Sequence, residues 1–193
     1  MIDLLSASLK PIHSSIPETV IEELGKLFYL KAYQRGEPVL IQGEYWSKAL
    51  VIESGLVRMH FLRKDGREFN KNFFTENSLM CPLTPTMQTA PSLFGITCIE
   101  ASTIWQCNID SFKERFDPND WEQIQRTLLM RLLDSKLKRE HDLLALDARQ
   151  RYQNLCVTQP HFAERVPLAH LATYLGVTDV SLSRLRRQLK DSE

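Results

Sequence analysis

Cysteine is scarce in this sequence, and the few cysteines are not grouped. Four occur in 193 residues: Cys81, Cys98, Cys107 and Cys156. No two of them have the CxxC spacing of a zinc site or a redox motif, and so sparse a set does not indicate a disulfide framework. We therefore expect reduced, buried thiols in a cytoplasmic protein.

Long apolar runs and an overall charge are also missing. No stretch approaches the roughly 20 apolar residues that a membrane-spanning helix needs, and the first residues lack the pattern of a signal peptide, so no membrane partner is predicted. The net charge is zero. It conceals an asymmetry, because residues 1–125 hold 12 Lys and Arg against 16 Asp and Glu, whereas residues 126–193 hold 12 against 8. A basic end on an acidic body is expected where that end meets phosphates.

The seven glycines are few, but most of them punctuate one region. Between residues 30 and 109, glycine-marked turns separate short runs rich in Val, Ile and Phe, at residues 39–41, 49–52, 56–61 and 69–74. This texture predicts a jelly-roll-like β-roll or sandwich. The segment Lys64-Asp65-Gly66-Arg67 predicts a hairpin turn, because Asp-Gly readily adopts positive φ.

Helical patterns lie on both sides of the predicted roll. Residues 17–29 predict an amphipathic helix, and residues 110–120 a short helix, a break at Pro118 and a restart capped by Asn119 or Asp120. A long helix is expected over residues 121–148. Its apolar stripe could simply cover the roll, but its length favours pairing with a second copy, which predicts a homodimer. Residues 149–156 continue as helix, and Pro160 is expected to end it.

Residues 168–187 carry the most informative pattern. Apolar residues recur around a single glycine: Leu171, Ala172, Leu175, Val177, Leu182 and Leu185 around Gly176. This spacing suits two short helices that cross steeply through a tight turn, and Thr178 is placed to cap the second helix. The exposed face of that helix then holds hydrogen-bonding and cationic groups: Ser181, Ser183, Arg184 and Arg187. A structural hairpin with a solvated charged face is the weaker alternative, and the pattern predicts a DNA-reading helix-turn-helix.

The candidate DNA contacts have different expected roles. Arg184 is the candidate for base contact, because a guanidinium can bridge O6 and N7 of guanine. Arg187 and Ser181 are expected to touch phosphates, and Thr178 is placed for a phosphate at the helix N-terminus. In a two-fold dimer the site in double-stranded DNA should be a palindrome.

The order of elements and the local motifs together resemble the CRP/FNR family of bacterial transcription regulators. The motifs lie at residues 35–44, 50–58, 65–68, 171–178 and 182–186. The segment from Arg151 to Pro167, followed by a reader without a wing before Glu193, is most similar to the short members found in Bacteroidetes.

The resemblance implies an α+β fold and a dimeric, sequence-specific regulator. A cyclic-nucleotide-binding-like β-roll sensor would occupy residues 1–115, a connecting and dimerisation helix residues 116–148, and a wingless DNA-binding domain residues 149–193. RNA polymerase is a further candidate partner. Ser183 and Arg184 match the family's Ser-Arg pair, whereas Val180 stands where a glutamate is common, so the operator should differ from the usual consensus.

The sensor departs from the family's cyclic-nucleotide chemistry. Cys81-Pro82 stands where the resemblance would place Gly-Glu, and residues 72–111 contain no Lys or Arg. A buried phosphate would then lack a cationic partner, which argues against cAMP. The lack of cysteine before Cys81 argues against an iron–sulfur cluster. His60 and Cys81 could ligate haem, but His60 lies on an alternating strand and is expected to be a surface or packing residue. No cofactor is therefore predicted.

Two other interpretations remain open. The apolar residues 80–94 are expected to fill the roll, although they could line a site for an unknown small-molecule effector. A β-roll used for ligand sensing or protein docking, whose helix-turn-helix no longer reads DNA, is the alternative function. An enzyme is not predicted, because the five histidines are spread singly along the chain: His13, His60, His141, His161 and His170.

Overall fold

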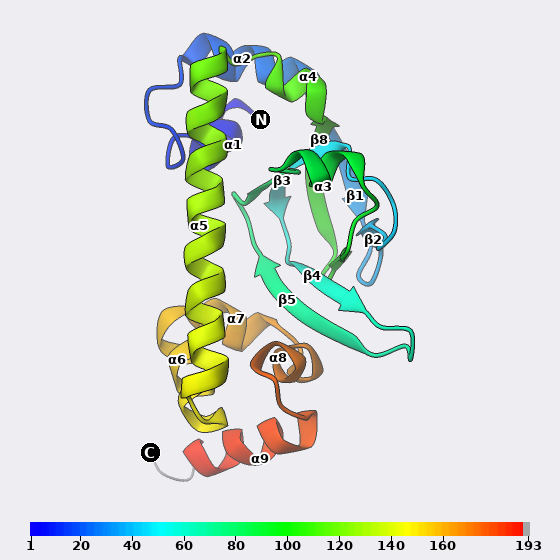
Figure 1. Ribbon diagram of the computed structural model, residues 1–193, viewed down its shortest axis with the longest axis vertical. Helices are drawn as coiled ribbons and strands as arrows, with labels where there is room; N and C mark the ends of the chain where they lie inside the picture. Colours follow the sequence, from blue (N-terminus) through cyan, green and yellow to red (C-terminus); the bar gives the residue numbers. More distant parts are fainter. Residues whose placement is uncertain (191–193) are drawn as a thin grey trace.

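A computed structural model describes residues 1–190, and its architecture is α+β (Figure 1). Two four-stranded antiparallel sheets form a roll, as predicted. One sheet has the order β1 (Tyr29–Tyr33), β8 (Ser102–Asn108), β3 (Lys48–Ser54) and β6 (Leu79–Met80), and the other β2 (Pro38–Leu40), β7 (Gly95–Cys98), β4 (Val57–Leu62) and β5 (Glu68–Phe74). The helix α3 (Pro85–Thr89) lies between β6 and β7 along the chain.

The turns of the roll follow the glycines. The β4–β5 hairpin turns at Gly66, which has a φ of 80°, so the predicted hairpin is confirmed. Between β3 and β4, Gly55 has a φ of 104°, and a Cβ there would lie 2.2 Å from Ser102 Oγ. Only glycine fits this position.

The hairpin also contains a bulge, which sequence reasoning did not anticipate. His60 of β4 pairs with Asn70 of β5, and Met59 pairs with Asn72, so Lys71 is an extra residue without a partner opposite it. A bulge bends a strand and redirects its side chains.

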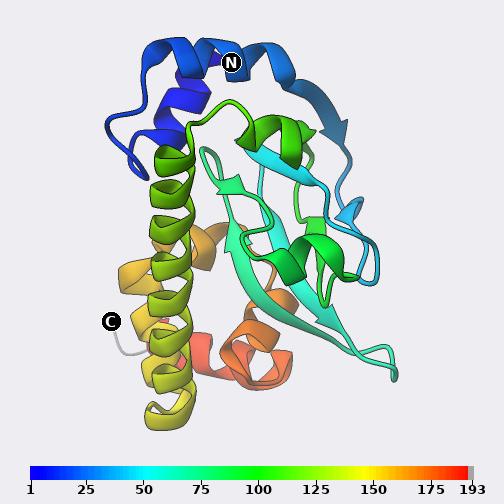
Figure 2. The ribbon, with the colours of Figure 1, turned by 45° about the horizontal axis from the view of Figure 1, so that its top comes forward.

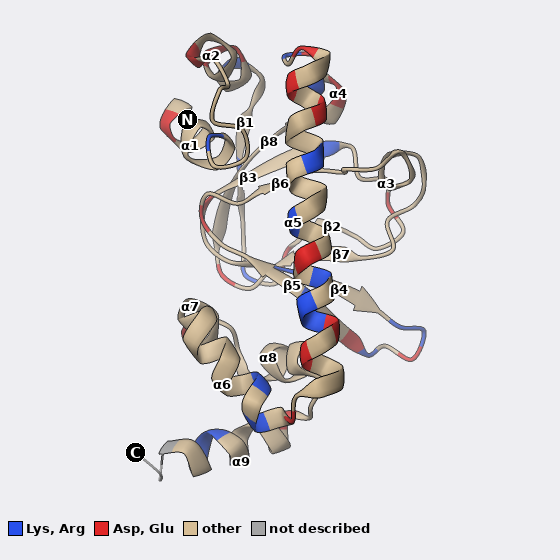
Figure 3. Cartoon of the chain, turned by 60° about the vertical axis from the view of Figure 1, so that its left-hand side comes forward, with Lys and Arg blue, Asp and Glu red and all other residues tan. Residues whose placement is uncertain are grey.

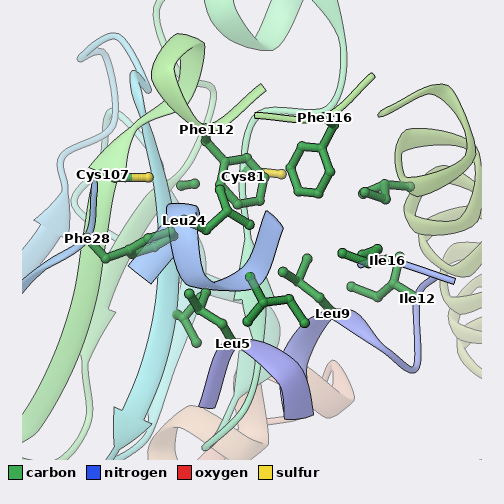
Figure 4. Close-up of a cluster of buried hydrophobic side chains, with 14 of the residues drawn as sticks. Leu5, Leu9, Ile12, Ile16, Leu24, Phe28, Cys81, Cys107, Phe112 and Phe116 are labelled. Carbon is green, nitrogen blue, oxygen red and sulfur yellow. The ribbon is translucent and has the colours of Figure 1, made fainter. Parts of the chain in front are cut away.

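One apolar cluster joins the N-terminal helices to the roll and to the long helix (Figure 4). Its helices are α1 (Ile2–Leu9), α2 (Glu18–Leu27) and α4 (Ile109–Lys113). Leu5 and Leu9 of α1 are fully buried there, and Phe112 of α4 packs edge-on against Phe28 and Phe116 at ring centroid distances of 5.9 and 5.2 Å. The helix α2 was predicted from the sequence, but α1 was not, because its eight residues give too short a pattern to be detected.

The long helix α5 spans Pro118–Ala145. The predicted short helix and restart are confirmed, because α4 ends at Lys113 and α5 begins at Pro118. The cap is Asp117, whose side chain accepts from the Asp120 N–H at 2.8 Å, so the predicted cap at Asn119 or Asp120 is wrong. Proline is well suited to a first helical position, because no N–H is needed there. The inner face of α5 buries Ile124 against the roll, while Leu128 and Leu132 are partly buried.

Four short helices lie at the far end of α5 (Figures 1 and 2): α6 (Ala148–Thr158), α7 (Pro160–Arg165), α8 (Leu168–Leu175) and α9 (Asp179–Lys190). Pro160 not only ends α6 but begins α7. Leu56, Phe73 and Ile99 of the roll share one apolar cluster with residues of these helices. The C-terminal helices therefore pack directly on the roll. The division at residues 115 and 148 stays a prediction, and the predicted wingless end falls on residues 191–193, outside the described residues.

Candidate nucleic-acid interface and sensor cavity

The helices α8 and α9 form the predicted helix-turn-helix. Gly176 adopts the left-handed conformation with a φ of 70°, and the Val177 N–H donates to the Ala172 carbonyl at 3.0 Å. Leu171, Ala172 and Leu182 are at most 1% exposed where the two helices meet. A small residue at the crossing and a glycine in the turn give this geometry, as the sequence pattern predicted.

Thr178 caps α9, as predicted. Its Oγ1 accepts from the Ser181 N–H at 3.2 Å and donates to Ser181 Oγ at 2.8 Å. Both hydroxyls therefore lie at the start of the helix and are bonded to each other. Asp179, which sequence reasoning missed, is exposed beside them and adds a negative charge where a phosphate would approach. Phosphate contacts by Thr178 and Ser181 stay predictions.

The remaining candidates share one exposed face of α9. Val180, Ser183, Arg184 and Arg187 follow the i, i+3, i+4, i+7 spacing of a helix face and line a shallow depression of about 380 Å³. Arg184 and Arg187 are exposed, and in the described part of the chain neither forms an ion pair. Figure 3 shows the basic residues along α9. These arginines are therefore free to bind an anion from outside.

Two hydrogen bonds from Asn70 of β5 connect the helix-turn-helix to the roll. The Asn70 side chain, 2% exposed on β5, donates to Thr173 Oγ1 at 2.7 Å and to the His170 carbonyl at 3.1 Å. Arg139 of α5 donates to the Asn70 carbonyl at 3.1 Å and lies 4.3 Å from the centre of the Tyr174 ring. The strand β5 thus contacts both the long helix and α8.

Arg165 of α7 contacts two carboxylates of the roll. Its guanidinium donates twice to Glu76, at 2.9 Å each, and twice to Glu100, at 3.3 and 2.8 Å. The hydrogen bonds from Arg165 lower the pKa of Glu76 to about 2. This bidentate pair ties α7 to the loops of the roll.

His60 is a packing residue, one of the two roles expected for it. It is 7% exposed, and its Nε2 lies 3.0 Å from Thr97 Oγ1. Its burial lowers its pKa, and the nearby Arg58 lowers it further, so the ring is neutral at physiological pH. Cys81 is fully buried, which raises its pKa to about 12 and keeps the thiol protonated.

A cavity of about 210 Å³ lies between the roll and α5. Its walls are mostly apolar and come from the strands β4, β5 and β6, from loops of the roll, and from α3 and α5. They include Trp46, Met59, Phe74, Met80, Phe94 and Leu128. Some of residues 80–94 fill the interior of the roll, as expected, and some line this cavity, which was the alternative for this segment.

Two cations reach this cavity from outside the segment that sequence reasoning considered. Lys71 comes from β5 and Arg131 from α5, on either side of the stretch 72–111 that lacks Lys and Arg. The inference that no cationic group could meet an anion here was therefore wrong. No continuous sequence pattern could have found this pair, because tertiary packing brings it together.

The described residues contain no group of three or more His, Cys, Asp or Glu side chains that could hold a metal ion. Within the same residues, no helix is long and apolar enough to cross a membrane.

No protein-family model and no curated protein sequence matches the chain. Solved structures do. The fold is similar to FixK2 from Bradyrhizobium japonicum, with 17% identity, a TM-score of 0.74 and 86% of each chain covered. It is similar to a CooA mutant from Carboxydothermus hydrogenoformans, with 20% identity, a TM-score of 0.68 and 96% of this chain and 84% of that chain covered. The c-di-GMP responsive regulator CLP from Xanthomonas campestris has 17% identity and a TM-score of 0.71, with 91% and 93% covered. The chain thus has the predicted α+β fold of CRP/FNR-type regulators.

Proposed function

We propose that this protein is a dimeric transcription regulator of the CRP/FNR type that reads a palindromic DNA site through α9. One observation carries the proposal: a complete helix-turn-helix presents Arg184 and Arg187, exposed and without an ion pair in the described part of the chain, on one face of its second helix. Cations held in this way on a helix that fits the major groove are suited to bases and phosphates.

In this mechanism α9 enters the major groove with its exposed face toward the bases. Arg184 bridges O6 and N7 of a guanine, and Ser183 beside it contacts a neighbouring base or phosphate. Arg187 binds the backbone and fixes the register. Val180, 56% exposed, offers an apolar contact to a thymine methyl group where a glutamate would select cytosine.

An apolar stripe on α5 supports the dimer. Met130, Leu133, Leu137 and Leu144 lie on the helix face turned away from the roll, and they are 52, 48, 56 and 81% exposed. A second copy of α5 would cover this stripe, since such residues are costly to leave in water. Two α9 helices related by a two-fold axis could then enter successive major grooves about 34 Å apart.

The dimer is tested by a double change, Leu133→Glu with Leu137→Glu. It should give monomers in sedimentation velocity at concentrations where the wild-type protein is a dimer, because paired glutamates cannot be buried in an apolar seam. Lys138→Glu, exposed on a different side of the same helix, is the matched control and should remain dimeric. A wild-type monomer at all concentrations would contradict this arrangement.

The function is tested by selecting bound sequences from a random pool of double-stranded DNA with the full chain, in the absence and presence of cell metabolites. We expect an enriched palindrome with a guanine in each half-site. The alternative, a roll whose helix-turn-helix no longer reads DNA, would be indicated by failure to enrich any sequence under either condition. Capture of RNA polymerase on the selected DNA would then test the further partner.

A further inference from the structure

We propose that the cavity between the roll and α5 binds a small organic acid, with its anionic group at Lys71 and its apolar body among Met80, Phe94 and Leu128. Binding itself does not depend on DNA recognition. Only the regulatory consequence, given below, rests on the proposed function.

The bulge in β5 lies at the cavity. Side chains alternate between the two faces of a regular strand, and a bulge interrupts that alternation. Lys71 is the extra residue of this bulge, and Lys71 and its neighbour Asn72 both line the cavity. The irregularity therefore places an ammonium group in the cavity, and bulges that redirect a side chain in this way are common beside functional sites.

The cavity lacks a counter-charge for its cations. Lys71 and Arg131 line the cavity, and its lining contains no Asp or Glu. In the described part of the chain the Lys71 ammonium contacts only aromatic rings, at 4.9 Å from the centre of Phe94 and 5.9 Å from that of Phe61. Burial lowers the pKa of Lys71, and Lys136 and Arg139 lower it further because they are positive as well. An anion would neutralise this excess.

A second donor in the same cavity also lacks an acceptor. The Trp46 side chain lines the cavity and is 4% exposed, and no group in the described residues accepts a hydrogen bond from its indole N–H. A buried donor without a partner costs free energy. Because the lining supplies positive charge and an unpaired donor but no Asp or Glu, a carboxylate is the group that complements it.

The size and the walls define the rest of the ligand. The cavity of about 210 Å³ is smaller than the roughly 300–1,000 Å³ of sites for drug-sized molecules, so a single or fused ring or a short chain fits best. The surrounding thioethers, rings and leucines favour an apolar body. A nucleotide is poorly matched, because the lining offers no carboxylate to accept from the hydroxyls of a sugar.

Occupancy of this cavity would reach the DNA-reading end through β5. Asn70, next to the bulge, holds α8 through His170 and Thr173, and its carbonyl accepts from Arg139 of α5. A ligand that draws Lys71 away from the rings would shift the backbone that carries Asn70. If the protein reads DNA as proposed, this shift alters the position of α8 and thereby operator affinity.

The test uses the full chain without DNA. Benzoate, 1-naphthoate and octanoate are compared with their neutral amides by thermal shift, and by titration calorimetry for the acid that stabilises most. We expect at least one acid to raise the melting temperature and to bind at least ten times more tightly than its amide. Failure of all three acids, or equal binding of acid and amide, would overturn the proposal.

Two variants locate the anionic group. Lys71→Met keeps the length and the apolar stem of the side chain and should reduce acid binding to the level of the amide. Lys64→Met, exposed in the turn of the same hairpin, should bind the acid as the wild type does. Undiminished acid binding by Lys71→Met would place the ligand elsewhere. Loss of DNA selection with acid binding intact would refute only the proposed function.

Discussion

The protein holds cations in two contrasting places. Arg184 and Arg187 are exposed on α9, whereas Lys71 is half-buried, lies near the Phe94 and Phe61 rings and lines the cavity under α5. An exposed guanidinium keeps its hydration, so leaving it without a counter-ion costs little free energy. Such a group therefore indicates a partner only when several of them recur along one helix face. A half-buried ammonium loses part of its hydration, so the lack of a counter-ion around it points to an anionic ligand.

Arg165 gives a third situation, in which the counter-ions are supplied by the chain itself. Its guanidinium is shared between Glu76 and Glu100, and it fastens α7 to the roll. A cation that is fully paired needs no further partner. We therefore assign Arg165 to structure, the α9 arginines to DNA and Lys71 to a small ligand, and each assignment can be tested separately.

The largest effect is expected for Arg184→Ala. Loss of a bidentate contact to guanine should weaken binding to the selected operator by about 1–3 kcal/mol and relax the preference at that base. Fluorescence anisotropy on the operator and on variants of the guanine position measures both changes. Equal losses on operator and random DNA would show that Arg184 does not read a base.

Arg187→Ala is expected to act differently. Loss of a phosphate contact should lower affinity on operator and random DNA alike and reduce the slope of log affinity against log salt by about 1 for each arginine removed. Titrations at several salt concentrations on both DNAs give these slopes. A loss confined to the operator would instead assign base contact to Arg187.

The helix-turn-helix could be predicted from the sequence because its determinants are local. The small residue, the turn glycine and the cap occur within a few positions of one another: Ala172, Gly176 and Thr178. The strands of the roll were predicted for the same reason, through glycine turns at short intervals. Local rules also failed once, at the cap of α5, because Pro118 begins that helix instead of preceding its cap.

The cavity could not be predicted, because its chemistry depends on distant residues. Lys71 reaches it through a bulge that appears only when β4 pairs with β5, and Arg131 arrives sixty positions later on α5. A search of the neighbouring sequence for a phosphate-binding arginine therefore gave the wrong picture of its charge. The helix α1 was not predicted for a related reason. Leu5 and Leu9 are buried only because they pack in a cluster with residues that are distant in the sequence.

Lys71→Met should also make the protein more stable in the absence of ligand. An apolar side chain of similar length removes a half-buried, unpaired charge, and we expect a gain of about 1 kcal/mol in the free energy of unfolding. Urea denaturation of the variant and of Lys64→Met measures this, and the exposed control should change by less than about 0.5 kcal/mol. A loss of stability would mean that the contacts of the ammonium with Phe94 and Phe61 outweigh its desolvation.

The smallest effect is expected for the paired cation, through Glu76→Gln. The pKa of Glu76 is lowered from 4.5 to about 2, so its ionised form stabilises the folded protein above pH 4.5, and this contribution is lost as the pH falls from 4.5 toward 2. Because the Glu76 side chain is 36% exposed, solvent screens the pair, and the variant should lose less than about 1 kcal/mol near pH 7. Urea denaturation across this pH range should show the difference from wild type vanish near pH 2. Glu122→Gln, exposed on α5, serves as the control. A difference that is constant with pH would mean that Glu76 acts through its shape and not its charge, and the contrast between paired and unpaired cations would lose its electrostatic basis.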